Sequence, residues 1–310
     1  MKTRFGAHGR RLRIAGLAAL MGLTGTAYAA TPAQEAGTSE VTLAGAGSQQ
    51  RLRYGQELRL QGFAAHRAAG RSVRLEHSPG GRGWRPLTNT ATRAGGAYEF
   101  AVRARESGAY RAVADSGAAS APRKVSVTPR LGGHATRHVL RGRAVRVRGA
   151  LRPGLGGRRV RVELRTRGGW KAVDRTRTGR GGRFSAAWRP SSTGSYRVRV
   201  RFAGDRLNAA AAQPLGGRVR VYRPTQASWY GPGFFGHRTA CGGTLGGGTL
   251  GVANRSLPCG TRVTLRYRGR SVTVPVIDRG PFGGGREWDL TAATKGRLGF
   301  PDVGTVWATR

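Results

Sequence analysis

The sequence predicts an all-β protein of three domains, and three observations lead to this expectation. Short runs that alternate apolar and polar residues, broken by glycine, recur from residue 41 to the C-terminus. Two stretches of about 90 residues repeat one another, and several short strands in that length favour a β-sandwich. The last 84 residues are glycine-rich and again β-patterned. Tight backbone crossings of that kind fit a small barrel.

The N-terminus has the pattern of a secretory signal peptide over residues 1–29. A basic segment ending at Arg13 precedes the apolar run Ile14–Leu23, and small residues at Ala27 and Ala29 suit cleavage after Ala29. A membrane anchor is the alternative, but the run is too short to span a bilayer of about 30 Å. With no cysteine nearby to accept a lipid, we expect a secreted protein, extracellular or associated with the cell wall, without a stable membrane anchor. Residues 30–40 are small and polar, as in a linker.

The repeat units run over residues 41–127 and 128–222. Arg141–Gly149 matches the alternating run at residues 54–62, and Gly157–Glu163 matches Gly70–Glu76, both at an offset of 87 residues. Further strands are expected at 98–103 and 109–113. In this pattern Leu58, Leu60, Val145 and Val147 face the core, and Arg59, Arg146 and Arg148 face solvent. The two units resemble the bacterial Ig-like repeats of secreted proteins.

Charge is very unevenly distributed along the chain. The net charge is +41, but residues 227–310 hold 11 basic and four acidic side chains, a net +7, which leaves +34 for the rest. Because an exported chain seldom meets nucleic acid, we expect anionic wall polymers as partners instead. A basic wall-binding stalk and a solvated spacer without a specific partner both remain open.

Two cysteines, Cys241 and Cys259, lie in the last domain. An even count in a secreted domain predicts a disulfide, and closing this loop stabilises the fold by about 3 kcal/mol. Two cysteines cannot build a four-ligand zinc site, so no metal and no cofactor are expected. A Cys–His nucleophile with His237, the one histidine of the domain, is the remaining alternative.

The last domain contains only four carboxylates: Asp278, Glu287, Asp289 and Asp302. Strands are expected at 262–267 and 271–277, so Asp278 ends an apolar strand just before the Gly280–Pro281 turn. A carboxylate there is held on a rigid element and faces a groove; the structural alternative is a turn cap. A short helix is expected at 289–298 with Asp289 as its N-cap.

Several spaced motifs of this domain carry a family resemblance. They are Ala227–Gly231, Arg238–Gly242, Val252–Thr261, Ile277–Phe282 and Arg286–Thr291. Residues 227–310 closely resemble the RlpA-like double-psi β-barrel, related to expansins and barwin, with residues 223–226 as a hinge before it. The resemblance implies a six-stranded double-psi barrel that binds peptidoglycan glycan strands. In some members this barrel is a lytic transglycosylase that cleaves the MurNAc–GlcNAc bond.

That chemistry needs few groups. An acid protonates the glycosidic oxygen and then, as a base, accepts the proton of the muramic C6 hydroxyl, which closes on C1 to give a 1,6-anhydro product. The resemblance assigns this acid/base role to Asp278. The chain departs from the pattern at Asn254, where catalytic members usually have His, and at Gly243, where they often have Glu. Asn254 is expected to orient or bind, since an amide does not titrate.

We expect the glycan to be bound by Trp229, Tyr230, Arg279, Phe282 and Asp289. Sugars stack on aromatic faces through their C–H bonds, and the resemblance matches Asp289 to the Asp that expansins hold in their groove. Phe234, Phe235 and Trp288 are further aromatic candidates, although about half of such residues are normally core. Three hypotheses follow. The first is a secreted lytic transglycosylase, the second a non-catalytic expansin-like module that binds or loosens glycan, and the third a structural wall protein held by charge.

Overall fold

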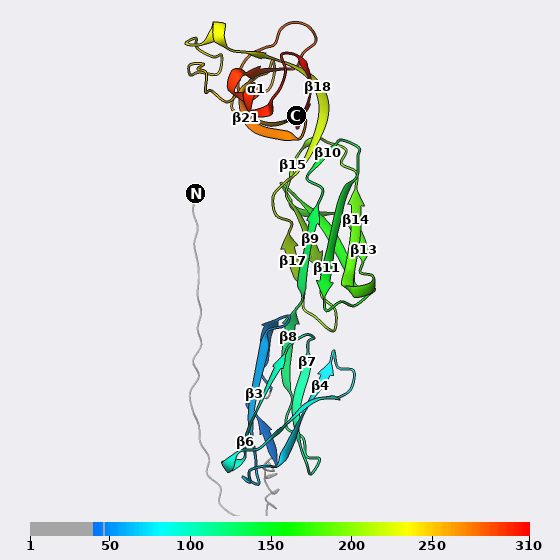
Figure 1. Ribbon diagram of the computed structural model, residues 1–310. Helices are drawn as coiled ribbons and strands as arrows, with labels where there is room; N and C mark the ends of the chain where they lie inside the picture. Colours follow the sequence, from blue (N-terminus) through cyan, green and yellow to red (C-terminus); the bar gives the residue numbers. More distant parts are fainter. Residues whose placement is uncertain (1–39, 46) are drawn as a thin grey trace, which may run out of the picture. The chain divides into compact units, whose positions relative to one another are not determined.

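The computed structural model describes residues 40–45 and 47–310. The signal peptide expected over residues 1–29 lies outside the described residues, as does the linker but for Glu40. Within the described part the regular elements are strands, apart from one short α-helix and three 3₁₀ turns (Figure 1). The all-β prediction is therefore confirmed. No helix in these ranges combines the length and apolarity that crossing a membrane requires.

The first repeat consists of two sheets around one hydrophobic core. Strands β1, β3 and β6 form one sheet, and the other has the order β2-β8-β7-β4-β5. The predicted alternation holds, because Leu58 and Leu60 are fully buried while Arg59 is exposed. The strands are β1 Val41–Leu43, β2 Gln49–Arg53, β3 Glu57–Ala64, β4 Ser72–Pro79, β5 Arg85–Ala91, β6 Ala97–Arg103, β7 Gly108–Ala114 and β8 Arg123–Thr128.

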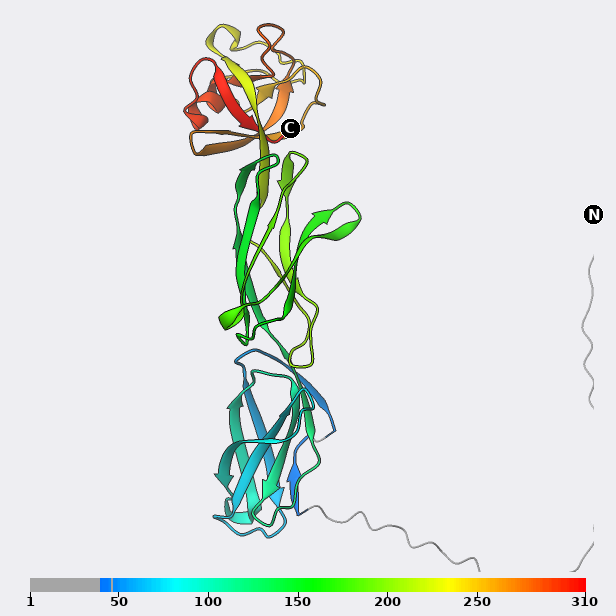
Figure 2. The same ribbon diagram turned by 90° about the vertical axis from the view of Figure 1, so that its right-hand side faces the viewer.

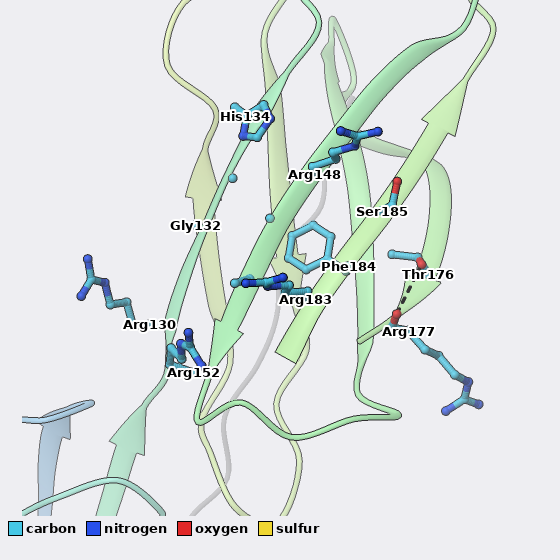
Figure 3. A pocket seen from close by; sticks show the side chains of 13 residues that line it. Arg130, Gly132, His134, Arg148, Arg152, Thr176, Arg177, Arg183, Phe184 and Ser185 are labelled. Carbon is cyan, nitrogen blue, oxygen red and sulfur yellow. Dashed lines mark hydrogen bonds between the residues drawn. The ribbon is translucent and has the colours of Figure 1, made fainter. Parts of the chain in front are cut away.

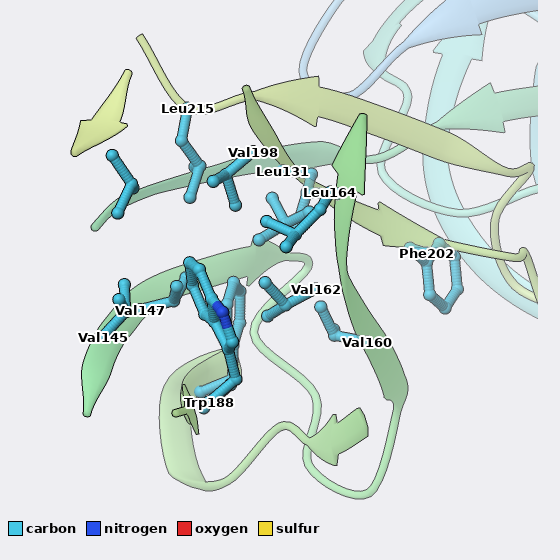
Figure 4. Close-up of a cluster of buried hydrophobic side chains, with 14 of the residues drawn as sticks. Leu131, Val145, Val147, Val160, Val162, Leu164, Trp188, Val198, Phe202 and Leu215 are labelled. Atoms are coloured by element: carbon cyan, nitrogen blue, oxygen red, sulfur yellow. The ribbon is translucent and has the colours of Figure 1, made fainter. Parts of the chain in front are cut away.

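The second repeat has the same plan, with sheets β14-β11-β9 and β13-β12-β16-β17. Figure 4 shows its core, where Val145 and Val147 lie near Trp188. Its strands are β9 Arg130–Ala135, β10 His138–Leu140, β11 Val145–Arg152, β12 Arg159–Thr166, β13 Gly169–Arg177, β14 Arg183–Trp188, β15 Gly194–Tyr196, β16 Val198–Phe202 and β17 Ala211–Pro214. The Ig-like assignment of both units stays a prediction.

One packing detail is common to both repeats. Gly62 on β3 lies opposite Tyr98, and Gly149 on β11 lies opposite Phe184. In each case the aromatic ring fills the space of the missing side chain, since a Cβ on either glycine would come within 2.5 Å of ring or hydroxyl atoms. This glycine–aromatic pair aligns the two repeats residue by residue.

The C-terminal strands follow the order β18-β22-β19-β21-β20-β23, and a further pairing of β18 with β23 closes the path. Their inner faces form a separate core that includes Val252, Val276, Trp288 and Leu290. The elements are β18 Val219–Tyr230, β19 Val252–Ala253, β20 Arg262–Tyr267, β21 Arg270–Asp278, β22 Trp288–Thr291, α1 Ala292–Leu298 and β23 Gly304–Ala308.

The hinge expected at residues 223–226 is wrong. These residues lie inside β18, which is one continuous strand (Figure 2). Its first part pairs with β10 and β15, and Arg223–Ala227 pairs with β23. Even Pro224, which lacks an amide donor, has Trp307 as its partner in the ladder. Pairing with strands distant in sequence outweighs the local turn signal.

The helix begins later than expected. Thr291, and not Asp289, is its N-cap, and the Thr291 side chain accepts a hydrogen bond from the Thr294 amide. Asp289 lies instead within strand β22. The Asp289 carboxylate therefore does not cap the helix, which was the structural role expected for it.

Candidate functional site

Two carboxylates flank one residue of the barrel. Ala253 on β19 pairs with Asp278 of β21 on one side and with Asp289 of β22 on the other. Neighbouring strands are about 4.8 Å apart, so the Cα atoms of the two aspartates are separated by roughly 10 Å. Residues in lateral register project from the same face of a sheet, so both carboxylates lie on the face that Ala253 presents.

A β-bulge places Asp278 on that face. Val252 pairs with Val276, but the next residue, Ala253, pairs with Asp278, which leaves Ile277 as an extra residue. Val276 is buried in the core, and strict alternation would turn Asp278 toward the core as well. The inserted residue reverses this, as bulges near functional sites commonly do.

The Asp278 carboxylate is held by backbone groups. Its Oδ1 accepts hydrogen bonds from the amides of Ala240 and Arg279, both at 2.9 Å. Its own carbonyl accepts the Asn254 amide at 3.1 Å. Two donors therefore fix Oδ1, and Oδ2 is left to a ligand or to the nearby Tyr230.

Asp289 has a different environment. Burial raises the pKa of Asp289 above its ordinary value, and the negative charge of Asp278 adds to the rise. A hydrogen bond from the Ser228 hydroxyl at 2.9 Å and the charge of Arg286 offset part of it. The carboxyl of Asp289 consequently keeps its proton to a higher pH than an exposed aspartate.

Tyr230 lies beside both carboxylates. Burial raises the pKa of the Tyr230 phenol, and the charges of Asp278 and Asp289 raise it further. No atom of the described residues meets the distance and angle limits of a hydrogen bond to its buried hydroxyl, but the Asp278 carboxylate is close enough for an interaction with this hydroxyl to raise the phenol pKa as well. A donor of this kind, adjacent to two acids, is available to a ligand oxygen.

Asn254 does not contact the Asp278 carboxylate through its side chain. Its Oδ1 accepts the amides of Ser256 and Leu257, and its Nδ2 donates to the Glu287 carbonyl at 3.2 Å. The residue is almost fully buried. These contacts form a local turn that fixes the end of β19, and the orienting or binding role expected for Asn254 stays a prediction.

The remaining candidates are distributed around the barrel. The Trp229 indole donates to Asp302 at 2.8 Å, and the Lys295 ammonium lies 3.7 Å from its ring centroid. Arg279 donates to the Asn254 carbonyl, and Phe282 is 80% exposed in the loop after Asp278. Trp288 is fully buried in the core and is removed from the groove candidates.

The sequence alone does not show how two further residues shape the site. Ser228 pairs laterally with Asp289, which only the strand pairing reveals. Gly243, at the position where the family often has Glu, has a φ of +83°, a conformation that favours glycine. The surrounding loop is therefore adapted to glycine there.

The predicted disulfide between Cys241 and Cys259 is present, with a Cα–Cα distance of 5.5 Å. It lies directly beside the site, because Cys241 follows Ala240 and its amide donates to the Ile277 carbonyl. Arg279 also donates to the Cys259 sulfur at 3.2 Å. Across the described residues no cluster of three or more His, Cys, Asp or Glu side chains could hold a metal ion.

Gly251 makes room for the bulge, and its replacement tests the role of this geometry. A Cβ on Gly251 would lie 2.4 Å from Cδ1 and 2.5 Å from Cγ1 of Ile277. We expect Gly251→Ala to lower the free energy of unfolding by about 1–3 kcal/mol, as overpacking does, and to displace Asp278. Urea unfolding measures the loss of stability, and binding to sacculi reports the displacement of Asp278.

Gly248→Ala is the matched control, since nothing lies within 4 Å of its added Cβ. Adding Ile277→Val to Gly251→Ala should restore part of the lost stability. Equal stability of the two glycine variants would contradict the proposed packing of Gly251 against the bulge.

Fold and site together define a small closed β-barrel with two neighbouring carboxylates on one face. Residues 224–308 match a double-psi β-barrel family model described as "Lytic transglycolase". This part of the chain is an RlpA-like double-psi β-barrel domain.

Curated relatives match over the same region. The chain is 50% identical over 80 residues to the probable endolytic peptidoglycan transglycosylase RlpA of Synechocystis sp., covering 25% of each. It is 42% identical to the enzyme of that name in Campylobacter jejuni (26% of this chain, 30% of the relative) and 45% identical to that of Pseudomonas aeruginosa (28% and 27%). The chain thus spans less than a third of the length of these relatives.

A solved structure, that of the Streptomyces papain inhibitor, is 24% identical. It covers 29% of this chain and 94% of its own length, with a TM-score of 0.24.

Proposed function

We propose that the protein is a secreted lytic transglycosylase that cleaves MurNAc–GlcNAc bonds of peptidoglycan and leaves 1,6-anhydromuramyl ends. The observation that carries this proposal is the placement of Asp278 and Asp289 on either side of Ala253, with different hydrogen-bond environments. The names of the relatives, which act on peptidoglycan as endolytic transglycosylases, support the substrate class.

The two carboxylates divide the proton transfers. Asp289, whose raised pKa favours the protonated form, donates its proton to the glycosidic oxygen as the bond to C1 breaks. The C6 hydroxyl oxygen bonds to C1, and the ionised Asp278 carboxylate accepts its proton. Exchange with water then restores both groups. The alternative is a single-acid mechanism in which Asp278 performs both transfers and Asp289 binds substrate.

Around this pair we propose that Trp229, Tyr230, Arg279 and Phe282 bind the glycan. The exposed ring of Phe282 offers a face on which a sugar can stack, and the Tyr230 hydroxyl offers a donor. We also propose that the Arg-rich repeats bind anionic wall polymers. The protein would then be retained in the wall after removal of its signal peptide.

A non-catalytic expansin-like module that binds glycan is the second candidate function. It is favoured by Asn254, which does not titrate and whose amide is already occupied by backbone groups. Gly243 likewise offers no carboxylate. In this case the same groove binds glycan strands without cleaving them.

Incubation of the mature protein with peptidoglycan distinguishes the two functions. Intact sacculi and sacculi stripped of stem peptides are digested, and mass spectrometry identifies the products. We expect anhydromuramyl fragments. Co-sedimentation with sacculi without any such fragment would exclude the enzyme and leave the binding module.

A further inference from the structure

The outer face of the sheet β14-β11-β9 in the second repeat, together with the end of the neighbouring strand β13, forms an open hollow of about 960 Å³ (Figure 3). Small residues form the floor of this hollow, because Gly132 of β9 pairs with Ala150 of β11 and both positions face outward. Arginines surround this floor. We call the site the arginine hollow, defined by Arg130, Arg148, Arg152, Arg177 and Arg183, with His134 at one end.

The charges of the arginine hollow have no counter-ions within the described residues. All five arginines are exposed, and none of the ion pairs found there includes them. Arg152 and Arg177 donate only to the carbonyls of Gly181 and Gly157. The side chains of Arg130, Arg148 and Arg183 make no hydrogen bond in this part of the chain. Five uncompensated cations around one floor repel one another unless an anion binds.

The first repeat provides an internal comparison. Aligned through the Gly62–Tyr98 and Gly149–Phe184 pairs, Ala150 corresponds to Phe63 and Arg148 to Gln61. Arg183 and Ser185 correspond to Ala97 and Glu99. The equivalent floor is thus filled by Phe63, 62% exposed.

Carboxylates also neutralise that face of the first repeat. Glu99 lies 3.5 Å from Arg59 and 4.0 Å from Arg93, and Glu57 pairs with Arg59 at 2.8 Å. The same sheet face is therefore neutralised in one copy and purely cationic in the other. A general excess of arginine does not explain this difference.

We propose that the arginine hollow binds a linear polymer that carries phosphate groups along its chain. Arg148 and Arg152 are four residues apart on β11, so their Cα atoms are separated by about 13 Å. Cations spread over that distance match the successive charged groups of a polymer better than they match one small anion. Guanidinium forks match phosphate oxygens in a bidentate manner.

The hollow favours a phosphodiester polymer without bases over nucleic acid. Single-stranded nucleic acids are bound through exposed aromatic rings on which bases stack. The aromatic residue here, Phe184, is only 5% exposed because it packs beneath Gly149. The choice of a wall polymer as the ligand rests on the proposed location of the protein in the cell wall. The binding experiment that tests this choice does not depend on whether the barrel cleaves glycan.

Binding of purified poly(glycerol phosphate) to the full mature chain tests this inference. We compare wild type with the triple variant Arg130→Gln, Arg148→Gln, Arg183→Gln. The binding constant for a flexible polyanion falls as the salt concentration rises, and the slope of log K against log salt is about −0.7 for each phosphate contact. Removal of three contacts should therefore lower affinity about 100-fold at about 0.1 M salt and reduce the slope of log K against log salt by about 2.

The matched control is Arg51→Gln, Arg82→Gln, Arg85→Gln, which removes the same charge from exposed arginines of the first repeat. Ser185→Glu is a second variant; it keeps every arginine but adds the carboxylate that Glu99 provides in the first repeat. We expect the control to bind nearly as wild type and Ser185→Glu to bind weakly.

Equal losses in the two triple variants would refute a local site and show diffuse attraction. Tighter binding, per charge, of single-stranded DNA or poly-L-glutamate than of poly(glycerol phosphate) would overturn the proposed occupant. Circular dichroism confirms that each variant is folded, and Ser185→Glu keeps the test decisive if the triple variant is not.

Discussion

We expect Asp278→Asn to lower the rate at which anhydromuramyl products form by about 10²–10⁴-fold, the usual contribution of a positioned acid or base. The asparagine oxygen can still accept the amides of Ala240 and Arg279, which now hold Oδ1. The loop should therefore keep its structure. Binding to sacculi should persist, because only the proton acceptor is lost.

Asp115→Asn is the control for this experiment, since its carboxylate is exposed in the first repeat, where it pairs with Arg71, and lies outside the barrel. It should retain full activity. Asp289→Asn separates the two mechanisms: a comparable loss supports the divided roles, and a loss confined to substrate affinity supports the single acid. Unchanged turnover in Asp278→Asn would refute the assignment of Asp278 in either mechanism.

The second large effect concerns stability. Replacement of both Cys241 and Cys259 by serine should lower the free energy of unfolding of the barrel by about 3 kcal/mol, because the bridge closes a loop of 18 residues. Ala240, whose amide holds Asp278, directly precedes Cys241 and loses the restraint of the bridge. We therefore expect weaker substrate binding as well. Urea unfolding followed by tryptophan fluorescence measures the loss.

Reduction of the wild type by a thiol reagent should give the same loss, and the double variant should be insensitive to the reagent. Each single serine variant checks that a lone thiol adds no further effect. A double variant as resistant to urea as the oxidised wild type would show that the bridge contributes nothing to folding.

Local sequence patterns were sufficient to predict the strands and the residues of the hydrophobic cores. The alternation around Leu58 and Val145 predicted which side chains are buried, since a period of two depends only on adjacent residues. Strands β20 and β21 also lie where their valines predicted them. The even cysteine count predicted the disulfide in the same direct way.

Features that depend on distant partners were not predictable. The bulge at Ile277 exists only relative to β19, and the burial that raises the pKa of Asp289 comes from packing around it. Asp289 matched an N-cap pattern, but pairing of β22 with β18 extends the strand past it to Thr291. The aromatic pattern likewise could not separate the buried Trp288 from the exposed Phe282.

Strand β18 has a consequence for cooperativity. Its residues are hydrogen-bonded first to strands of the second repeat and then to strands of the barrel, without a break. Calorimetry should therefore record these two domains melting in one transition. A barrel expressed from residue 227 onward would lack the ladder partners of β23 and expose an edge prone to pairing with other chains.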